Sequence, residues 1–368
     1  MNSTLVIVPK KKSSRVSWAQ LNPDLLRIIS KKLCDICSFI CFRAVCKRWR
    51  AATSLSDPPR QFPCVIDWPK GKGKLDDTLR VYSISSRGTH TFEVPDAHFH
   101  GPSDGYMLLY EPYRSAKECQ SFLNPLTWIE WLFPLDMPVH IVKPIRLGGN
   151  LIRNDGPALL YKDDEHYFLC FWQSEKNDWT EMRVPSINTV ALYDHKIFFA
   201  ELGHQYKRVG VIDETTGVLL SYLPPPKEYF DHRYLIATDD GLLAVEMKDG
   251  MTILPSLVKD VTKCQFEVFR LKNYPQNPHW TKLSGIGDLM LFLDQQNGFS
   301  LKASDFGGFK GNCIYFITTG RKFLKKGYEH VIGRFDLESN RTERVPAPAW
   351  LGLRQWERRA AWFIPTLN

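Results

Sequence analysis

Long hydrophobic runs are missing from this sequence. No segment of its 368 residues approaches the roughly 18 consecutive apolar residues that a membrane-spanning helix needs. The short apolar run Leu5–Val8 stands before the lysines Lys10–Lys12, which reverses the order found in a secretory signal peptide. These absences argue against a membrane protein and predict an intracellular protein in a reducing compartment.

Paired cysteine spacing is also missing. The nine cysteines are an odd number, scattered from Cys34 to Cys313, so no disulfide framework is expected. Four of them follow the spacing C-x2-C-x3-C-x4-C, at Cys34, Cys37, Cys41 and Cys46. They lie along predicted helix, whereas structural zinc ligands usually sit on turns. We therefore expect free cysteines that pack as small apolar side chains rather than a metal site.

Catalytic and cofactor-binding motifs are absent as well. The sequence has neither a Gly-x-Ser-x-Gly nucleophile elbow nor a His-Glu-x-x-His zinc motif. The triplet Asp305-Phe306-Gly307 resembles a kinase magnesium motif, but the other kinase motifs do not accompany it. His98 and His100, the only close histidine pair, would share one face of a strand and would need a third ligand to bind a metal. The sequence thus predicts no catalytic residue, no cofactor and no metal.

What the sequence does contain is typical of pleated strands joined by frequent turns. Aromatic residues make up 13% of the chain, and 23 glycines and 24 prolines accompany them. Hydrophobic residues at 43% and charged residues at 24% are ordinary values for a globular protein. We therefore expect a mainly β protein of two or three domains, or one large domain with an appendage.

Positive charge is concentrated near the N-terminus. Residues 1–60 hold 12 basic and 3 acidic side chains, a net charge of +9, whereas the other 308 residues hold 36 and 37. A flexible basic tail is predicted over residues 1–12. Such a basic segment can meet an acidic partner, or it can simply be solvated. Its aromatic residues are few and sit at core spacing, so nucleic acid is not the expected partner. The lysine run is ambiguous as a nuclear signal, which leaves cytoplasm and nucleus open.

Three short helices are predicted in this basic region. Asn22 is a suitable N-cap and Pro23 a suitable first residue for a helix over residues 23–33, where apolar side chains recur at helical spacing. Asp35 can cap a second helix, and a third is predicted over Lys47–Thr53. Three helices in about 40 residues bury little surface, so the unit needs a partner or a neighbouring domain.

The character of the sequence changes at Asp57-Pro58-Pro59, because paired prolines remove two backbone donors and stop a helix. This change predicts a helical domain over residues 13–57 and a second domain over residues 60–368. From Phe62 onward the apolar runs are short, several alternate with polar residues, and turn residues bound them, as expected for half-buried strands.

Weak internal repeats occur in the second domain. The segments Val209–Gly217 and Ile332–Asn340 both predict a strand, a tight turn and a second strand, and Asn124–Thr127 is a looser copy. These copies are 89 and 123 residues apart, near multiples of the about 40 to 50 residues of a propeller blade. We expect a β-propeller of six or seven blades, with a large β-sandwich as the alternative.

The first helices resemble the F-box motif. Leu21-Asn22-Pro23 opens the helix as Leu-Pro does in that motif, and Arg43-Ala-Val-Cys-Lys-Arg-Trp49 matches the motif's Arg-x-Val-Cys-x-x-Trp ending. The resemblance implies docking on a Skp-type adaptor and, through it, on a cullin. Cys37 and Ser38 depart from the longer apolar or charged residues usual there. The resemblance implies a first helix that faces the adaptor or closes the domain, with Leu21, Pro23, Leu25, Leu26, Ile28, Ile29 and Leu33. The residues that it assigns to the small core beneath this helix are Phe39, Phe42, Val45, Cys46 and Trp49.

The second domain resembles the kelch-like propeller, described as KIB-type, that follows the F-box in plant proteins. The segments that carry this resemblance are Leu291–Asp294, Gly298–Ser300, Gly311–Phe316, Gly333–Asp336 and Trp362–Leu367. The resemblance implies that the propeller binds a target protein. The binding residues cannot be read from the sequence, but Trp128, Trp131 and Arg354–Arg359 are of the residue types that often anchor interfaces.

These features predict the substrate-recognition subunit of a Skp-cullin-F-box E3 ubiquitin ligase, a non-catalytic protein that binds an adaptor and an unknown target protein. The departures at Cys37 and Ser38 motivate an alternative, a scaffold or decoy that holds a target without ubiquitinating it. A propeller enzyme using His98 and His100 would need convergent carboxylates or a metal, and the sequence offers no such spacing.

Overall fold

The computed structural model describes most of the chain in two compact units, residues Met1–Arg60 and Gln61–Asn368. The predicted basic tail, residues 1–12, lies outside the described residues. Those described are 18–55, 57–69, 78–93, 98–103, 105–111, 119–132, 141–145, 158–162, 166–173, 178–185, 187–201, 208–214, 216–226, 233–248, 260–294, 297–322, 327–352 and 358–367.

The first unit contains a 3-10 turn and three short α-helices. These are η1 (Trp18–Gln20), α1 (Pro23–Ser30), α2 (Ile36–Ala44) and α3 (Lys47–Ala51). The capping predictions are confirmed: the Asn22 side chain accepts from the Asp24 N–H, and the Asp35 side chain accepts from the Ser38 N–H. α1 ends three residues earlier than its apolar spacing indicates, because the chain leaves the helix at Lys31 and turns toward Asp35.

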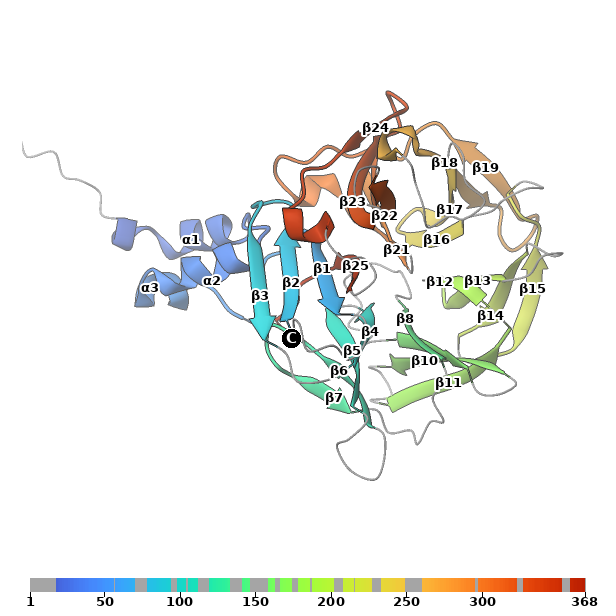
Figure 1. Cartoon of the computed structure of the whole chain (residues 1–368), viewed down its shortest axis with the longest axis horizontal. Helices are drawn as coiled ribbons and strands as arrows, with labels where there is room; N and C mark the ends of the chain where they lie inside the picture. The colour runs from blue at the N-terminus through green and yellow to red at the C-terminus, as the bar shows by residue number, and fades with distance from the viewer. Residues whose placement is uncertain are drawn as a thin grey trace, which may run out of the picture. The chain divides into compact units, whose positions relative to one another are not determined.

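The second unit is a six-bladed β-propeller, so the predicted fold class is confirmed and the blade count is six rather than seven (Figure 1). The strands of blades one to three are β1 (Cys64–Pro69), β2 (Thr78–Ser83), β3 (Thr89–Glu93), β4 (His98–Ser103), β5 (Tyr106–Glu111), β6 (Cys119–Leu123), β7 (Glu130–Leu132), β8 (Ile141–Ile145), β9 (Ala158–Lys162), β10 (Tyr167–Gln173) and β11 (Asp178–Val184). Those of blades four to six are β12 (Ile187–Tyr193), β13 (Lys196–Glu201), β14 (Val209–Asp213), β15 (Leu219–Leu223), β16 (Arg233–Thr238), β17 (Gly241–Lys248), β18 (Gln265–Lys272), β19 (His279–Leu283), β20 (Leu289–Leu293), β21 (Gly298–Lys302), β22 (Cys313–Lys322), β23 (Gly327–Asp336) and β24 (Arg341–Arg344). The last strand, β25 (Arg358–Phe363), belongs to blade one.

The apolar core of the propeller lies between neighbouring blades rather than at the centre of the ring. Separate clusters of buried side chains join blades one and two, two and three, three and four, four and five, and five and six. Each sheet therefore buries both faces against its neighbours, which explains why central strands such as β20 read as unbroken apolar runs.

A close approach between an aromatic ring and a glycine recurs in blades four and six. Phe199 is paired across the sheet with Gly210, and Phe316 is paired with Gly333. A Cβ built on Gly210 would lie 2.0 Å from the Phe199 Cζ, and one on Gly333 would lie 2.2 Å from the Phe316 Cζ. These glycines belong to the repeated segments found in the sequence, and they leave room for the ring above them.

The same tight turn leads into the outer strand of four blades. In each turn, a side-chain oxygen of the first residue accepts a hydrogen bond from the backbone N–H three residues later. The fifth residue of the turn has a positive φ angle. The pairs of first and fifth residues are Ser83 and Arg87, Asn124 and Trp128, Asp213 and Gly217, and Asp336 and Asn340. The repeats found in the sequence are therefore structurally equivalent turns.

The spacing of these turns explains why the blade count was ambiguous. The 123 residues between Asp213 and Asp336 span two blades and not three, because the sixth sheet has five strands in the order β21-β20-β22-β23-β24. Its β20 and β22 are parallel, which requires a crossover connection that lengthens the blade.

The ring is closed by strands from both ends of the propeller unit. β25 pairs antiparallel with β1 over six residues and completes the first sheet, whose order is β25-β1-β2-β3. Trp362 on β25 is buried; its Nε1 donates to the Leu293 carbonyl at 2.8 Å, and its backbone N–H donates to Asp294 Oδ2 at 3.0 Å. Asn124 of blade two donates to the Thr366 carbonyl at 3.1 Å. The C-terminal segment is thus bonded to blades on both sides.

In the described part of the chain, no helix combines the length and the apolar character that crossing a membrane requires.

Candidate functional site

Two faces of α1 differ in what they contact. Leu26 and Ser30, one helical turn apart, are buried, and Leu26 packs with Phe42 and Ala52 in the core of the helical unit. Leu25, Ile28 and Ile29 occupy a separate face, and their exposed fractions are 50%, 60% and 39%. A helix in water normally exposes polar side chains, so this face is an apolar surface without a partner among the described residues.

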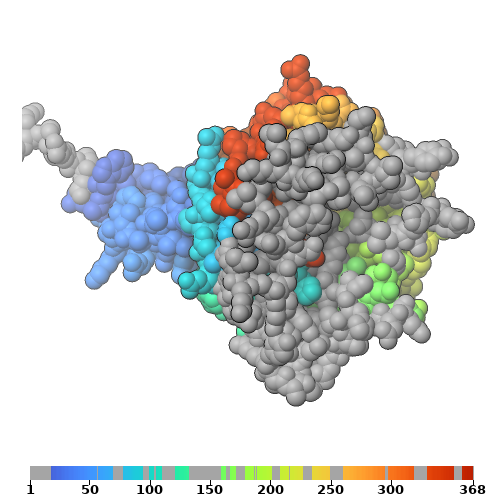
Figure 2. Space-filling view, viewed as in Figure 1, coloured from blue at the N-terminus to red at the C-terminus, as the bar shows by residue number. Residues whose placement is uncertain are grey.

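The core beneath this face is small and held by aromatic contacts. The rings of Phe42 and Trp49 lie 4.5 Å apart, and the Trp49 Nε1 donates to the Trp18 carbonyl at 3.2 Å. Arg43 lies with its guanidinium 5.8 Å from the Phe39 ring centroid and donates to Thr53 Oγ1 at 2.9 Å. These contacts join η1, α2 and α3, and the packing of Leu26 on Phe42 adds α1 to the same block, drawn in blue in Figure 2.

The residues implied by the F-box resemblance fall into three groups in the structure. Pro23, Leu25, Ile28, Ile29 and Val45 are exposed. The half-buried residues are Leu21, Leu33, Cys46 and Trp49, and the buried ones are Leu26, Phe39 and Phe42. The last group cannot present its side chains to a partner, and Val45, which the resemblance assigned to the small core, is 58% exposed.

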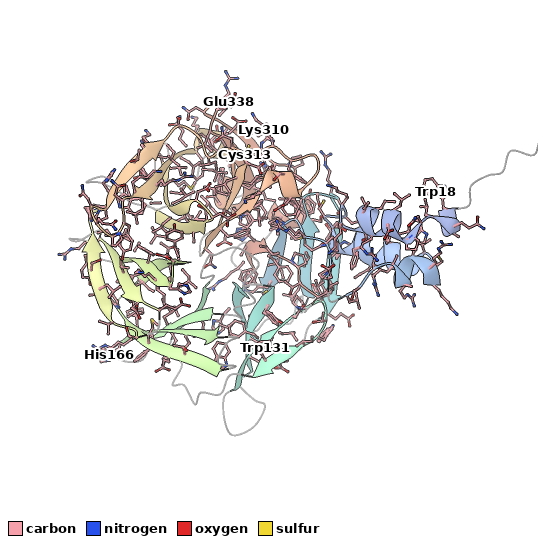
Figure 3. All side chains as sticks on the ribbon, turned by 180° about the vertical axis from the view of Figure 1, so that it is seen from behind. Trp18, Trp131, His166, Lys310, Cys313 and Glu338 are labelled. Carbon is pink, nitrogen blue, oxygen red and sulfur yellow. The ribbon has the colours of Figure 1, made fainter. Side chains whose placement is uncertain are left out.

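Three further large apolar residues that are exposed on the helical unit were not assigned to docking from the sequence. Ile40 on α2 and Leu55 after α3 are each about half exposed, and Trp18 in η1 lies at the surface, as Figure 3 shows. Helical spacing alone did not separate Ile40 from its buried neighbour Phe39, because both belong to one apolar run. Trp18 precedes the predicted helix, so no periodic pattern included it.

Exposed basic side chains belong to the same helical unit as this apolar surface. Lys47, Arg48 and Arg50 on α3 are all exposed. The acidic residues of the same unit are engaged locally, because Asp35 caps α2 and Asp24 forms an ion pair with Arg27 at 3.0 Å. The surface of the helical unit therefore combines exposed aliphatic side chains with uncompensated positive charge, which suits an acidic protein partner.

The four clustered cysteines are free thiols in this unit. Burial, with the nearby Asp35 and Cys41 adding to it, raises the pKa of Cys37 to about 11, so this thiol stays protonated at neutral pH. Among the described residues, no three histidine, cysteine or acidic side chains come together in a way that could hold a metal ion. Cys34, Cys37 and Cys46 are half-buried, as expected of small packing residues, whereas Cys41 is exposed.

The remaining chemical candidates occupy structural positions. His98 and His100 are both on β4, where a register irregularity between Phe99 and Gly101 interrupts the pairing with β5. Asp305 ends the 3-10 turn η3 (Ala303–Asp305), and the buried Phe306 packs edge-on against Phe62 with ring centroids 5.4 Å apart.

The proposed interface anchors on the propeller are only partly described. Trp128 is exposed at the outer turn of blade two, whereas Trp131 is half-buried and packs against Tyr106 with ring centroids 5.8 Å apart. Residues 354–357 lie outside the described residues, and Arg358 and Arg359 are on β25. Trp128 is therefore the exposed aromatic residue among the described candidates.

Comparison with known proteins finds similar plant proteins along most of the chain. The chain is 23% identical to the F-box protein SKIP23 of Arabidopsis thaliana, over 91% of this chain and 96% of that protein. It is 24% identical to a putative F-box/kelch-repeat protein of the same plant, over 82% of this chain and 87% of that protein. The crystal structure of TolB from Acinetobacter baumannii matches over 88% of this chain and 72% of the TolB chain, with a TM-score of 0.48 and 8% sequence identity.

The family comparison concerns the propeller directly. Residues 81–336 match the model of the KIB1-4 beta-propeller, a span that begins in β2 and ends with β23. The match covers more than half of the chain and includes three of the four repeated turns and the paired glycines described above. The chain therefore belongs to the KIB1-4 beta-propeller family and is similar over most of its length to plant F-box proteins.

Proposed function

We propose that this protein is the substrate-recognition subunit of a Skp-cullin-F-box E3 ubiquitin ligase, in which the helical unit docks a Skp-type adaptor and the propeller binds the target. The observation that supports this proposal best is the exposed aliphatic face of α1, formed by Leu25, Ile28 and Ile29. An adaptor that covers this face removes the cost of its exposure to water.

The mechanism requires no catalytic residue on this chain. The adaptor connects the helical unit to a cullin, and the cullin carries the enzymes that transfer ubiquitin. By holding a target on the propeller, the protein raises the effective concentration of target lysines near the loaded enzyme. Such a subunit would act in the cytoplasm, the nucleus or both.

The charge of the helical unit gives the docking step an electrostatic component. Lys47, Arg48 and Arg50 are exposed on α3, and residues 1–60 carry a net charge of +9. Attraction to an acidic adaptor surface would mainly speed association, and salt would screen it over about 8 Å at physiological ionic strength. Adaptor binding should therefore weaken with added salt but persist, because the aliphatic contacts remain.

The test is co-purification of the full chain with a plant Skp-type adaptor, compared with the double variant Leu25→Ala and Ile29→Ala. If both side chains are buried at the interface, their truncation should cost about 4 kcal/mol, roughly a thousandfold in Kd. Folding should be little affected, because surface substitutions usually change stability by about 0.5 kcal/mol or less. Deletion of residues 1–57 should abolish the complex.

A matched control is available on the propeller. Leu219→Ala with Leu220→Ala removes two leucines that are 45% and 48% exposed, close to the exposure of Leu25 and Ile29. This control should bind the adaptor like the unaltered protein. If the Leu25 and Ile29 double variant binds the adaptor as tightly as the unaltered protein does, α1 does not carry the docking face.

A second measurement, of ubiquitin transfer, distinguishes a ligase subunit from the alternative of a scaffold or decoy. In the structure, Ser38 contributes to the N-terminal cap of α2 through Asp35, and Cys37 is half-buried, so the departures at these two positions have local structural uses. A complex that assembles with adaptor and cullin but transfers no ubiquitin to a bound target would favour the scaffold. Ubiquitin transfer in a reconstituted assembly would favour the receptor.

A further inference from the structure

The outer edge of blade four differs from the outer edges of the other blades. Figure 1 places the outermost strands β3, β7, β11, β15, β19 and β24 around the rim of the propeller. Five of these strands contain at least one Asp, Glu, Lys or Arg, whereas β15 has the sequence Leu-Leu-Ser-Tyr-Leu. Charged residues on edge strands discourage association between molecules, so β15 lacks a protection that the other five have.

Four apolar side chains at this edge are exposed. Val218, Leu219, Leu220 and Tyr222, here named the blade-four patch, have exposed fractions of 57%, 45%, 48% and 37%. The equivalent turn of blade six is followed by Arg341, Thr342, Glu343 and Arg344, which is the polar composition expected at a rim. Blade two also exposes two apolar residues at its equivalent turn, Trp128 and Ile129, but its outer strand begins with Glu130. An exposed apolar outer strand without any charged residue is therefore found in blade four.

The strand β15 contains a local irregularity. Val211 is paired with Ser221 and Ile212 with Leu219, so Leu220 is an extra residue without a partner on β14. The residues Leu219–Tyr222 are all exposed, on either side of this bulge. The exposure therefore belongs to the outer strand as a whole and not to the bulge alone.

The rest of the patch is held in place by packing. The Arg208 guanidinium lies 5.3 Å from the centroid of the Tyr222 ring, and Phe199 meets the same ring edge-on at 6.3 Å. Leu223 is buried in the cluster that joins blades four and five. Pro224 follows at once and supplies no backbone N–H, so the strand stops there.

We propose that two copies of this chain associate through the blade-four patch, related by a two-fold axis. A two-fold contact brings each strand against itself, so a charged outer strand such as β24 would face its own like charges. The strand β15 carries no formal charge of its own, and the Arg208 charge beside it lies over the Tyr222 ring. The inference concerns the propeller alone and goes beyond the proposed adaptor docking.

The size of the patch sets the strength of this association. Partly exposed side chains on one short strand offer much less than the roughly 1,200 to 2,000 Å² that stable complexes bury. The two copies should therefore exchange between monomer and dimer, with a Kd weaker than about 1 µM. An obligate dimer would need a larger and more continuous apolar surface.

The first experiment is sedimentation velocity of the full chain from about 2 to 200 µM, a range chosen to bracket this Kd. The average mass should rise with concentration. Leu220→Lys, which places like charges near the axis, should weaken association at least about tenfold. Thr281→Lys adds the same charge to the exposed edge of β19 and should leave association unchanged.

A charge exchange gives the second experiment. Leu220→Lys and Leu220→Asp should each remain monomeric alone, and an equal mixture of the two should recover the dimer through opposite charges. Recovery in the mixture supports the two-fold contact and shows that both variants are folded. Failure of the mixture to associate, when the unaltered chain does, would place the contact elsewhere and overturn the proposal.

Two further outcomes would also reject it. A monomer at every concentration would leave the patch to a different protein. Association that is lost in the Leu25→Ala and Ile29→Ala variant, but kept in Leu220→Lys, would assign the contact to the helical unit. Neither outcome bears on whether the adaptor binds, so the two proposals fail independently.

Discussion

Replacement of Trp362 by Phe tests how the propeller ring is held closed. Trp362 lies on β25, is only 2% exposed, and meets Phe292 of blade six edge-on with ring centroids 5.2 Å apart. Its indole N–H donates to the Leu293 carbonyl at 2.8 Å. Phe keeps an aromatic ring and the backbone N–H that donates to Asp294, so the change removes the indole donor and part of the ring volume.

The expected loss of stability follows from these contacts. Removing the indole donor from the buried Leu293 carbonyl should cost about 1 to 3 kcal/mol. The smaller ring should add about 1 kcal/mol for the space it leaves. The free energy of unfolding of the propeller should therefore fall by about 2 to 4 kcal/mol.

Equilibrium urea unfolding, followed by tryptophan fluorescence and circular dichroism, measures this change. With a slope of about 3 kcal/mol/M, a loss of 3 kcal/mol moves the midpoint of the propeller transition by about 1 M. Trp128→Phe is the matched control, because Trp128 is exposed at an outer turn. If Trp362→Phe lowers the midpoint no more than Trp128→Phe does, the indole hydrogen bond does not help to close the ring.

Three other predictions concern the repeated turns and paired glycines. Gly210→Ala should destabilise the propeller by about 1 to 3 kcal/mol, because the new Cβ would lie 2.0 Å from Phe199 Cζ; thermal unfolding measures this. Arg87→Asn should stabilise it by about 0.5 to 1 kcal/mol, because asparagine tolerates the positive φ of 56° at this exposed turn residue; urea unfolding measures this. The Ser339 N–H, with Lys310, holds the pKa of Asp336 below its usual value, so this carboxylate contributes stability above its ordinary pKa. That contribution is lost as the pH falls through the lowered pKa, and Asp336→Asn should show a flatter acid limb in a stability-against-pH profile.

Each of these predictions has a control at an equivalent or contrasting position. Gly307→Ala should be almost neutral, since a Cβ there would meet nothing within 4 Å, and an equal loss at both glycines would refute the steric reason. Asn340→Arg should lower stability by about as much as Arg87→Asn raises it. An acid limb that is the same in Asp336→Asn as in the unaltered chain would show that other groups control acid unfolding; Figure 3 marks the neighbouring Lys310 and Glu338.

Local features of the fold could be predicted from the sequence because short-range chemistry determines them. Asn22 and Asp35 cap the first two helices as their side chains indicate, and the Asp213 and Asp336 segments form the same turn. The blade count depended on long-range pairing. The parallel pairing of β20 with β22, and the pairing of β1 with β25 almost 300 residues later, leave no periodic signal in the sequence.

The candidate docking face was predictable as a set of residues but not as a surface. Helical spacing identified Leu25, Leu26, Ile28 and Ile29 together, yet only the packing of α1 on its neighbours separates the buried Leu26 from the other three. Val45 was assigned by resemblance to the small core and is exposed, because α2 ends at Ala44 and the chain turns there. The blade-four patch could not be predicted either, because its side chains are exposed through the position of β15 at the outer edge of its sheet.

The pairing of β25 with β1 has a consequence for biosynthesis. The first blade of the propeller is complete only when Arg358–Phe363 pairs with β1, almost 300 residues later in the chain. Until β25 has been synthesised, β1 presents an open edge along Cys64–Pro69, and a chain cut before Arg358 lacks the strand that covers it. Closure of the ring therefore follows the synthesis of every other described strand of the propeller, so the blade that is begun first is finished last.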